Sequence, residues 1–172
     1  MVWRIAPLGG PERKVAETQP GLPDFLPATL AWCPDSTCLL VTDSLGADKP
    51  DALFRISVDT GERRQLTHPQ GRVRDAGPAV SPDGSLLVFR RDNTPGSGEF
   101  YRLSLKDGKD SQGDPVRLTS TMAWPSSPVW IPDSREILFS ARGGLFRLDA
   151  LTGGTPSRLP FVDQDGPAGS ST

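Results

Sequence analysis

Residues 78–89 read Pro-Ala-Val-Ser-Pro-Asp-Gly-Ser-Leu-Leu-Val-Phe, a tight turn that leads directly into an apolar segment. Proline presets φ for the second position of a type I turn, aspartate tolerates the third, and glycine can leave the turn into a strand. The short flanking runs are rich in branched and aromatic residues, which is typical of β-strands. This stretch therefore predicts a β-hairpin.

The same elements recur along the chain about every 50 residues, a period typical of propeller blades. Pro34-Asp35 and Pro132-Asp133 repeat the turn at Pro82-Asp83. A second pattern, an apolar residue followed by an aromatic, an arginine and an aliphatic residue, occurs at 2–5, 53–56, 100–103 and 145–148. Its last three copies precede a Gly-containing turn and a basic-to-aliphatic segment. Four short strands per repeat predict the blades of a β-propeller. A helical solenoid is excluded, because 18 glycines and 18 prolines among 172 residues leave no uninterrupted helical window.

These motifs resemble the TolB-type, WD-like β-propeller repeat, whose consensus runs roughly Pro-Ala-x-Ser-Pro-Asp-Gly, an aliphatic strand, an aromatic strand and Arg-Leu-Thr. Residues 78–84 fit it throughout, whereas Cys33 and Ser36 depart from it in the first copy and Ile131 and Ser134 in the third. The resemblance covers nearly the whole chain. It says little about function, because propellers serve many unrelated tasks.

We therefore expect an all-β fold: a partial β-propeller with about three complete four-stranded antiparallel blades and half blades at the ends. TolB-type propellers usually have six blades, so the resemblance implies a truncated segment. Such an open arc is expected to self-associate through its blade edges. The predicted units are 1–20 as the end of a preceding blade, 21–67, 68–119 and 120–160 as blades, and 161–172 as the start of a next blade.

Composition and the repeated pattern limit what the surface can do. The net charge of −2 argues against binding nucleic acid through this segment, because phosphate binding needs a concentrated basic field. No membrane insertion is expected. The strand aromatics Phe54, Tyr101 and Phe146 are predicted to be core contacts. The arginines that follow the aromatics are predicted to cover the neighbouring blade with their stems, their heads solvated or paired: Arg4, Arg55, Arg102 and Arg147.

Cys33 and Cys38 flank one hairpin turn and could face each other across it. Free structural thiols are the expectation, because the equivalent positions in the other repeats hold no cysteines. A disulfide is the alternative, and it would suit an extracytoplasmic location. A zinc site is not expected, because this pair has no second pair of ligands.

No catalytic set, cofactor or metal is predicted. The only histidine, His68, lies in a predicted loop, and no Gly-x-Ser-x-Gly elbow supplies a nucleophile. Asp35, Asp83 and Asp133 are explained by their turns. We expect the chain to catalyse nothing.

Function is then expected at the end of the propeller opposite the Pro-Asp turns, where the longer connections lie: 43–51, 68–77, 90–98 and 120–127. Arginine and tryptophan are enriched among interface hot spots, which makes these loops the predicted partner site. The alternative is that the loops are polar for solubility and that Trp124 packs beneath them. The candidate partner-binding residues are His68, Arg72, Arg74, Arg90, Arg91 and Trp124.

Three hypotheses about function follow from the resemblance. The leading one is a non-catalytic protein-binding or sensing propeller segment of a bacterial envelope or regulatory protein, periplasmic or otherwise extracytoplasmic, with a cytoplasmic location as the alternative. Similar repeats occur in periplasmic TolB, which binds the peptidoglycan-associated lipoprotein, and in sensor regions of bacterial regulators. The second is the substrate-gating propeller of a prolyl-oligopeptidase-like serine peptidase. The third is a purely structural repeat array.

Overall fold

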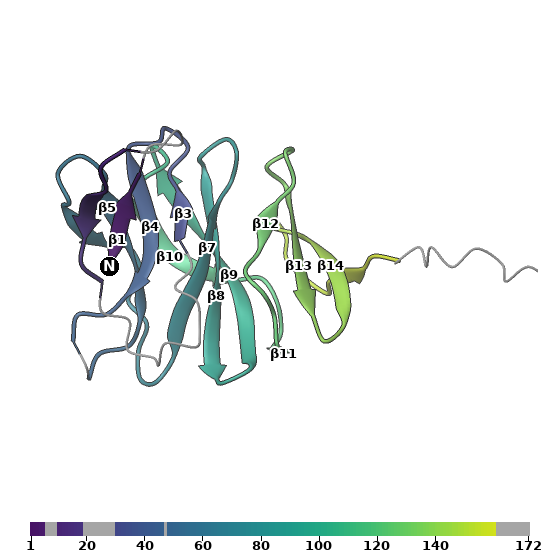
Figure 1. Cartoon of the computed structure of the whole chain (residues 1–172). Helices are drawn as coiled ribbons and strands as arrows, with labels where there is room; N and C mark the ends of the chain where they lie inside the picture. Colours follow the sequence, from purple (N-terminus) through teal and green to yellow (C-terminus); the bar gives the residue numbers. More distant parts are fainter. Residues whose placement is uncertain (6–9, 19–29, 47, 161–172) are drawn as a thin grey trace, which may run out of the picture.

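A computed structural model describes residues 1–5, 10–18, 30–46 and 48–160 (Figure 1). Every regular element in these ranges is a β-strand. No helix long and apolar enough to span a membrane is found in them. The predicted half blade at 161–172 lies outside the described residues. The strands are β1 (Val2–Arg4), β2 (Arg13–Ala16), β3 (Leu30–Trp32), β4 (Cys38–Asp43), β5 (Ala52–Ser57), β6 (Arg63–Gln65), β7 (Arg74–Val80), β8 (Leu86–Thr94), β9 (Ser97–Lys106), β10 (Asp110–Arg117), β11 (Met122–Ala123), β12 (Val129–Trp130), β13 (Glu136–Ala141), β14 (Gly144–Asp149) and β15 (Ser157–Arg158).

The strands form three antiparallel meanders and one two-stranded pair. The first sheet has the order β3-β4-β5-β6, the second β10-β9-β8-β7 and the third β12-β13-β14-β15, while β11 adds to β9. The N-terminal pair is β1-β2. The sheets stand side by side along the chain, from the purple N-terminal strands to β13 and β14 (Figure 1). The prediction of an all-β partial propeller built from four-stranded blades is confirmed.

The Pro-Asp turns form as the sequence predicts. The turn at Pro82 is closed by a hydrogen bond of 2.8 Å from the amide of Gly84 to the carbonyl oxygen of Ser81. The Asp83 carboxylate accepts from the amide of Ser85 at 3.0 Å, which fixes the exit of the chain into β8. Gly84 has φ +77°, and the equivalent Ser36 and Ser134 also adopt positive φ. Glycine is therefore the best residue at this position, and serine occupies it at a cost in backbone strain.

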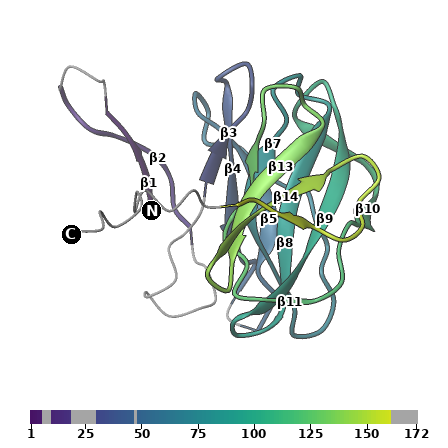
Figure 2. The same ribbon diagram turned by 90° about the vertical axis from the view of Figure 1, so that its right-hand side faces the viewer.

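The core lies between the sheets, because alternate residues of each strand point to opposite faces. In β8, Leu87 and Phe89 face the first sheet, whereas Val88 faces the third. In β4, Leu40 faces the second sheet and Leu39 faces the N-terminal pair. The first and second sheets are thus buried on both faces, and Figure 2 looks onto the outer face of the third.

The aromatic residues of the repeated pattern pack as predicted in the three sheets. Phe54 is only 2% exposed, and Tyr101 and Phe146 pack half-buried against the two clusters between the sheets. In the first copy of the pattern, Trp3 is 52% exposed, because its strand belongs to the N-terminal pair and its face has no described neighbour. Burial of this position therefore depends on a preceding sheet.

The arginines of the same pattern reach toward the next sheet in two of four copies. Arg55 on β5 lies 3.6 Å from the carboxylate of Asp110 on β10. Arg102 on β9 donates to the carbonyl oxygen of Leu151 after β14. Arg147 instead pairs with Glu136 at 2.5 Å within its own sheet. The predicted covering of the neighbouring blade is therefore present for Arg55 and Arg102.

The prediction of free thiols at Cys33 and Cys38 is wrong, because the two residues form a disulfide. The Pro-Asp turn places them directly opposite each other, with the amide of Cys33 donating to the carbonyl oxygen of Cys38 at 2.9 Å and a Cα–Cα distance of 5.3 Å. Comparison with the other repeats misled the prediction, because the absence of cysteines from their equivalent positions does not bear on the distance between Cys33 and Cys38. Both cysteines are buried between the first and second sheets.

Reduction of this disulfide is expected to lower the free energy of unfolding by about 2 kcal/mol, the chain-entropy cost for so short a loop. The fold should persist, because the turn hydrogen bonds and the surrounding cluster do not depend on the bridge. Urea unfolding with and without reductant, together with thiol titration, measures the effect. Two reactive thiols in the untreated protein would contradict the bridge itself.

Candidate interaction site

The connections opposite the Pro-Asp turns form what we call the loop end: residues 44–46, 48–51, 66–73, 95–96, 118–121, 124–128 and 142–143 (Figure 1). The hairpins β4–β5, β8–β9 and β13–β14 all turn here. Of the six predicted partner-binding residues, three lie in these connections and three lie in strands.

Arg74, Arg90 and Arg91 were predicted in loops, and this placement is wrong. Arg74 begins β7, whereas Arg90 and Arg91 lie within β8, which continues to Thr94. The strands can include these charged residues because each arginine is paired with a carboxylate. Cross-strand pairing with β9 therefore continues to the short turn at Pro95 and Gly96.

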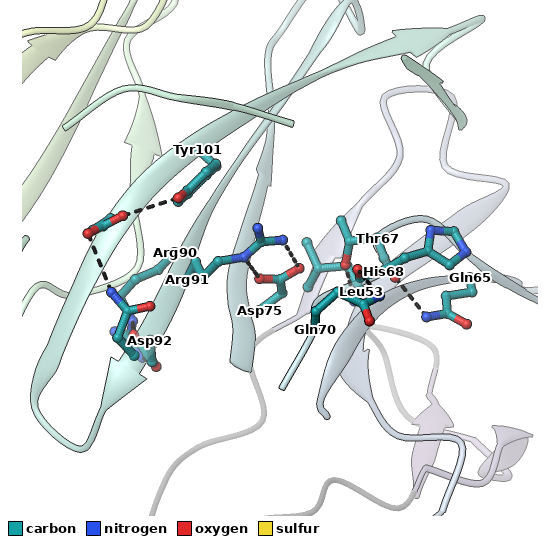
Figure 3. A network of polar contacts seen from close by, with 12 residues as sticks. Leu53, Gln65, Thr67, His68, Gln70, Asp75, Arg90, Arg91, Asp92 and Tyr101 are labelled. Atoms are coloured by element: carbon teal, nitrogen blue, oxygen red, sulfur yellow. Dashed lines mark hydrogen bonds and ion pairs between the residues drawn. The ribbon is translucent and has the colours of Figure 1, made fainter. Parts of the chain in front are cut away.

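Arg91 and Asp75 form a buried ion pair between β8 and β7 (Figure 3). The Asp75 carboxylate is fully buried and accepts two hydrogen bonds from Arg91, at 2.7 and 2.9 Å. Burial raises the pKa of Asp75, against the opposing effects of Arg91 and the Thr67 hydroxyl. Thr67 also accepts from the amide of Leu53 at 2.9 Å, so the network joins the first sheet to the second.

The network continues from Arg91 to β9. The guanidinium lies 4.7 Å from the centre of the Tyr101 ring, a cation–π contact. The Tyr101 hydroxyl donates to Glu99 at 3.1 Å, and burial together with Glu99 raises the pKa of Tyr101. Arg91 is therefore a part of the interface between sheets, with little of its guanidinium left to meet a partner.

Two further arginines are similarly engaged. Arg74 lies 3.0 Å from Asp51, and both side chains are at least nine-tenths buried. Arg90 binds Asp92 through two hydrogen bonds, at 2.5 and 2.9 Å, and also donates to the carbonyl oxygen of Pro125. Arg90 thereby fixes the loop that carries Trp124.

The other three predicted residues are exposed at the loop end: His68, Arg72 and Trp124. Among the described residues, no side chain is hydrogen-bonded to the ring of His68, and Gln70 donates to its backbone carbonyl oxygen at 3.2 Å. Trp124 is 69% exposed, which contradicts the alternative that it packs beneath the loops.

Trp124 is held by the β8–β9 turn. Its amide donates to the carbonyl oxygen of Gly96 at 2.7 Å. A Cβ placed on Gly96 would lie 2.8 Å from the indole, so the ring packs closely against the backbone there. Any side chain at residue 96 would displace the ring. Trp124 is thus presented to solvent in a fixed position.

Sequence reasoning missed two arginines at the β13–β14 turn. Arg142 is exposed in the β13–β14 turn, and Arg158 on β15 donates to the carbonyl oxygen of Gly143 at 3.4 Å. An arginine before Gly143-Gly144, where a hairpin turn usually has asparagine, was the signal available in the sequence. Trp124, Arg142 and Leu145 line one open groove of about 640 Å³.

The opposite end has a second hollow, of about 330 Å³, beside the Pro-Asp turns of the first and second sheets. Hydrogen bonds from Lys109 and from the amide of Thr37 lower the pKa of Asp35 to about 2. The Ser81 hydroxyl and the Ser85 amide lower that of Asp83. Both carboxylates stabilise their own turns. No group of three His, Cys, Asp or Glu side chains able to hold a metal ion is found in the described part of the chain.

Comparison with solved structures identifies proteins of similar fold. No protein-family model matches the sequence. A protein assigned as TolB from Agrobacterium tumefaciens superposes with a TM-score of 0.65 at 21% identity, over 87% of this chain and 52% of its own. The fold is a partial TolB-like β-propeller. TolB from Acinetobacter baumannii gives a TM-score of 0.56 at 20% identity, over 77% of this chain and 32% of its own.

A TolB-like fold does not select a function. Oligogalacturonate lyase in complex with manganese superposes with a TM-score of 0.54 at 17% identity, over 75% of this chain and 34% of its own. The chain spans about half the length of the first TolB protein and a third of the second. Function must therefore be argued from the loop end itself.

Proposed function

We propose that this chain is a non-catalytic, protein-binding segment of a TolB-like propeller, and that it binds its partner through the loop end. One observation carries the proposal: Trp124 is 69% exposed yet fixed against Gly96. A rigid, exposed tryptophan is a typical hot spot, because little conformational entropy is lost when a partner covers it.

An extracytoplasmic location, in a bacterial envelope or regulatory protein, is part of the same proposal. The Cys33–Cys38 disulfide supports it, because disulfides persist in oxidising compartments and are rare in the cytosol.

Panning of a random peptide display library on the purified chain tests the binding function. Wild-type protein is expected to enrich binders whose affinity falls at least tenfold with Trp124→Ala, the loss of an interface hot spot. Ile5→Ala, at an equally apolar exposed site outside the loop end, is the matched control. Absence of enrichment, or equal losses in both variants, would refute binding through the loop end.

A panel of peptidase and esterase substrates tests the absence of catalysis. No turnover is expected, since the ring of His68 has no described hydrogen-bonded partner that could act as a nucleophile or orient it. Turnover abolished by His68→Ala would overturn this part of the proposal.

A further inference from the structure

The groove beside Trp124 combines an aromatic face with unpaired positive charge. Its lining comes from two neighbouring segments, the loop after β11 and the β13–β14 turn with its flanking residues: Trp124, Ser140, Ala141, Arg142, Gly143, Gly144 and Leu145. Ser126 connects the segments, since its amide donates to the carbonyl oxygen of Ser140 at 2.8 Å. The groove is therefore built on paired backbone and not on a free loop.

Two residues of the groove adopt a backbone conformation that their side chains disfavour. Trp124 has φ +55° and precedes a proline, a position that favours extended conformations. Arg142 has φ +35° in the hairpin turn, where asparagine or glycine would be less strained. Burial of the side chains does not offset this backbone strain, because both side chains are exposed. Strain of this kind concentrates at functional sites, where the side chain is needed for binding.

Within the described part of the chain, neither arginine at the groove has a carboxylate partner. No hydrogen bond or ion pair joins the guanidinium of Arg142 to any described residue. Arg158 has one hydrogen bond, to the carbonyl oxygen of Gly143, and packs 3.1 Å from the position of a Cβ on Gly144. The nearby carboxylate of Asp92 is neutralised by Arg90. Arg142 thus contributes a positive charge to the lining of the groove, and Arg158 contributes a second one next to Gly143 and Gly144.

We propose that this groove binds an acidic peptide segment of a protein partner. Carboxylates of the peptide pair with Arg142 and Arg158, and an apolar side chain between them covers Trp124 and Leu145. Arginine is suited to this task, because its planar guanidinium binds carboxylates through paired hydrogen bonds. A nucleic acid fits less well, since two arginines in a chain of net charge −2 do not supply an extended basic field. This inference rests on the proposed protein-binding function and specifies the partner's chemistry.

Two fluorescein-labelled peptide pools test the proposal by fluorescence anisotropy. One pool alternates glutamate with random apolar residues, and the other has glutamine at the glutamate positions. The acidic pool is expected to bind about tenfold more tightly than the amide pool at low ionic strength, the sum of two surface ion pairs. Added salt should reduce this difference.

Variants locate the binding. Arg142→Gln combined with Arg158→Gln should abolish the preference for the acidic pool and leave binding of the amide pool unchanged. Trp124→Ala should weaken both pools. Arg4→Gln combined with Lys106→Gln removes the same charge from exposed sites on other strands, outside the groove, and should leave the preference intact.

Each other outcome is decisive. If both double variants reduce the preference for the acidic pool equally, the acidic peptides are attracted by the charge of the whole surface. The groove would then not be their binding site. Binding of both pools without acidic preference, lost in Trp124→Ala, would refute the acidic partner while leaving the proposed function standing. Failure of both pools to bind at any concentration tested would count against both proposals. A labelled single-stranded oligonucleotide provides a further test. If it binds tightly to the wild type and not to the Arg142→Gln, Arg158→Gln variant, the ligand of the groove is a nucleic acid and the acidic-peptide proposal is wrong.

Discussion

Replacing Phe54 with alanine is expected to lower the free energy of unfolding by about 3–5 kcal/mol. Phe54 is 2% exposed and packs in the cluster between the first sheet and the N-terminal pair. Its ring also lies 4.5 Å from the guanidinium carbon of Arg63, and this contact would be lost as well. The surrounding strands are held by their hydrogen bonds, so they cannot close the cavity completely. Urea unfolding followed by circular dichroism measures the effect.

Trp3→Ala is the matched control, because Trp3 holds the equivalent position of the first repeated pattern but is 52% exposed. We expect it to cost about 0.5 kcal/mol or less, the usual range for surface substitutions. Phe54→Leu, which leaves a smaller cavity, should destabilise in the same direction and covers the case in which the alanine variant does not fold. Equal losses for Phe54→Ala and Trp3→Ala would show that the strand faces are assigned incorrectly.

Replacing Arg91 with methionine is expected to destabilise the chain by about 3–5 kcal/mol at neutral pH, because it leaves a buried charge without its partner. The Asp75 carboxylate has no exposed surface, and it would lose Arg91, the group that most favours its ionised form, while keeping the weaker effect of the Thr67 hydroxyl. Methionine retains much of the apolar contact that Arg91 makes with Tyr101. The loss should therefore report mainly on the charge.

The loss should also depend on pH in a defined direction. Without Arg91, the pKa of Asp75 in the folded protein rises further above the unfolded value of about 3.9. A raised pKa in an acid means that stability is lost as pH increases from the unfolded to the folded pKa, and regained on acidification. The difference between variant and wild type should therefore shrink as pH falls toward about 4. A difference independent of pH would show that Asp75 is not the group left unpaired.

Removing both partners provides the control. Arg91→Met combined with Asp75→Leu leaves no buried charge, so it should restore most of the lost stability. Glu17→Ala, which breaks the exposed pair with Lys14, should leave the free energy of unfolding almost unchanged. A double variant as unstable as Arg91→Met alone would mean that packing, and not charge, explains the loss.

The blades could be predicted from the sequence because their turns and strands depend on interactions between residues close together in the chain. The Pro-Asp turns depend on φ preferences and on an Asp carboxylate that bonds to amides two residues away, and both lie within a few residues. The alternation of apolar residues in segments such as Leu87-Val88-Phe89 then assigns each side chain to one interface or the other. Because the same pattern recurs, agreement among repeats strengthened each prediction.

Which side chains pair with each other was not predictable from the same residues. Arg90 and Arg91 look like loop residues until Asp92 and Asp75 are placed beside them. The cysteines at 33 and 38 looked unpaired, since the other repeats offered no precedent for a bridge. Ion pairs and disulfides require a distance between two atoms, and a single sequence does not give this distance.

The sequence by itself determined that the chain is an array of four-stranded blades, since turn and strand preferences are local and recur in every repeat. It also determined that the loop end carries arginine and tryptophan. The tertiary structure decided which of these side chains remain available: it buries Arg74 against Asp51 and pairs Arg91 with Asp75, while it leaves Trp124 and Arg142 exposed beside one groove. The physical reason is that burial and charge neutralisation depend on neighbours from other strands, and only the packed sheets bring those neighbours into contact.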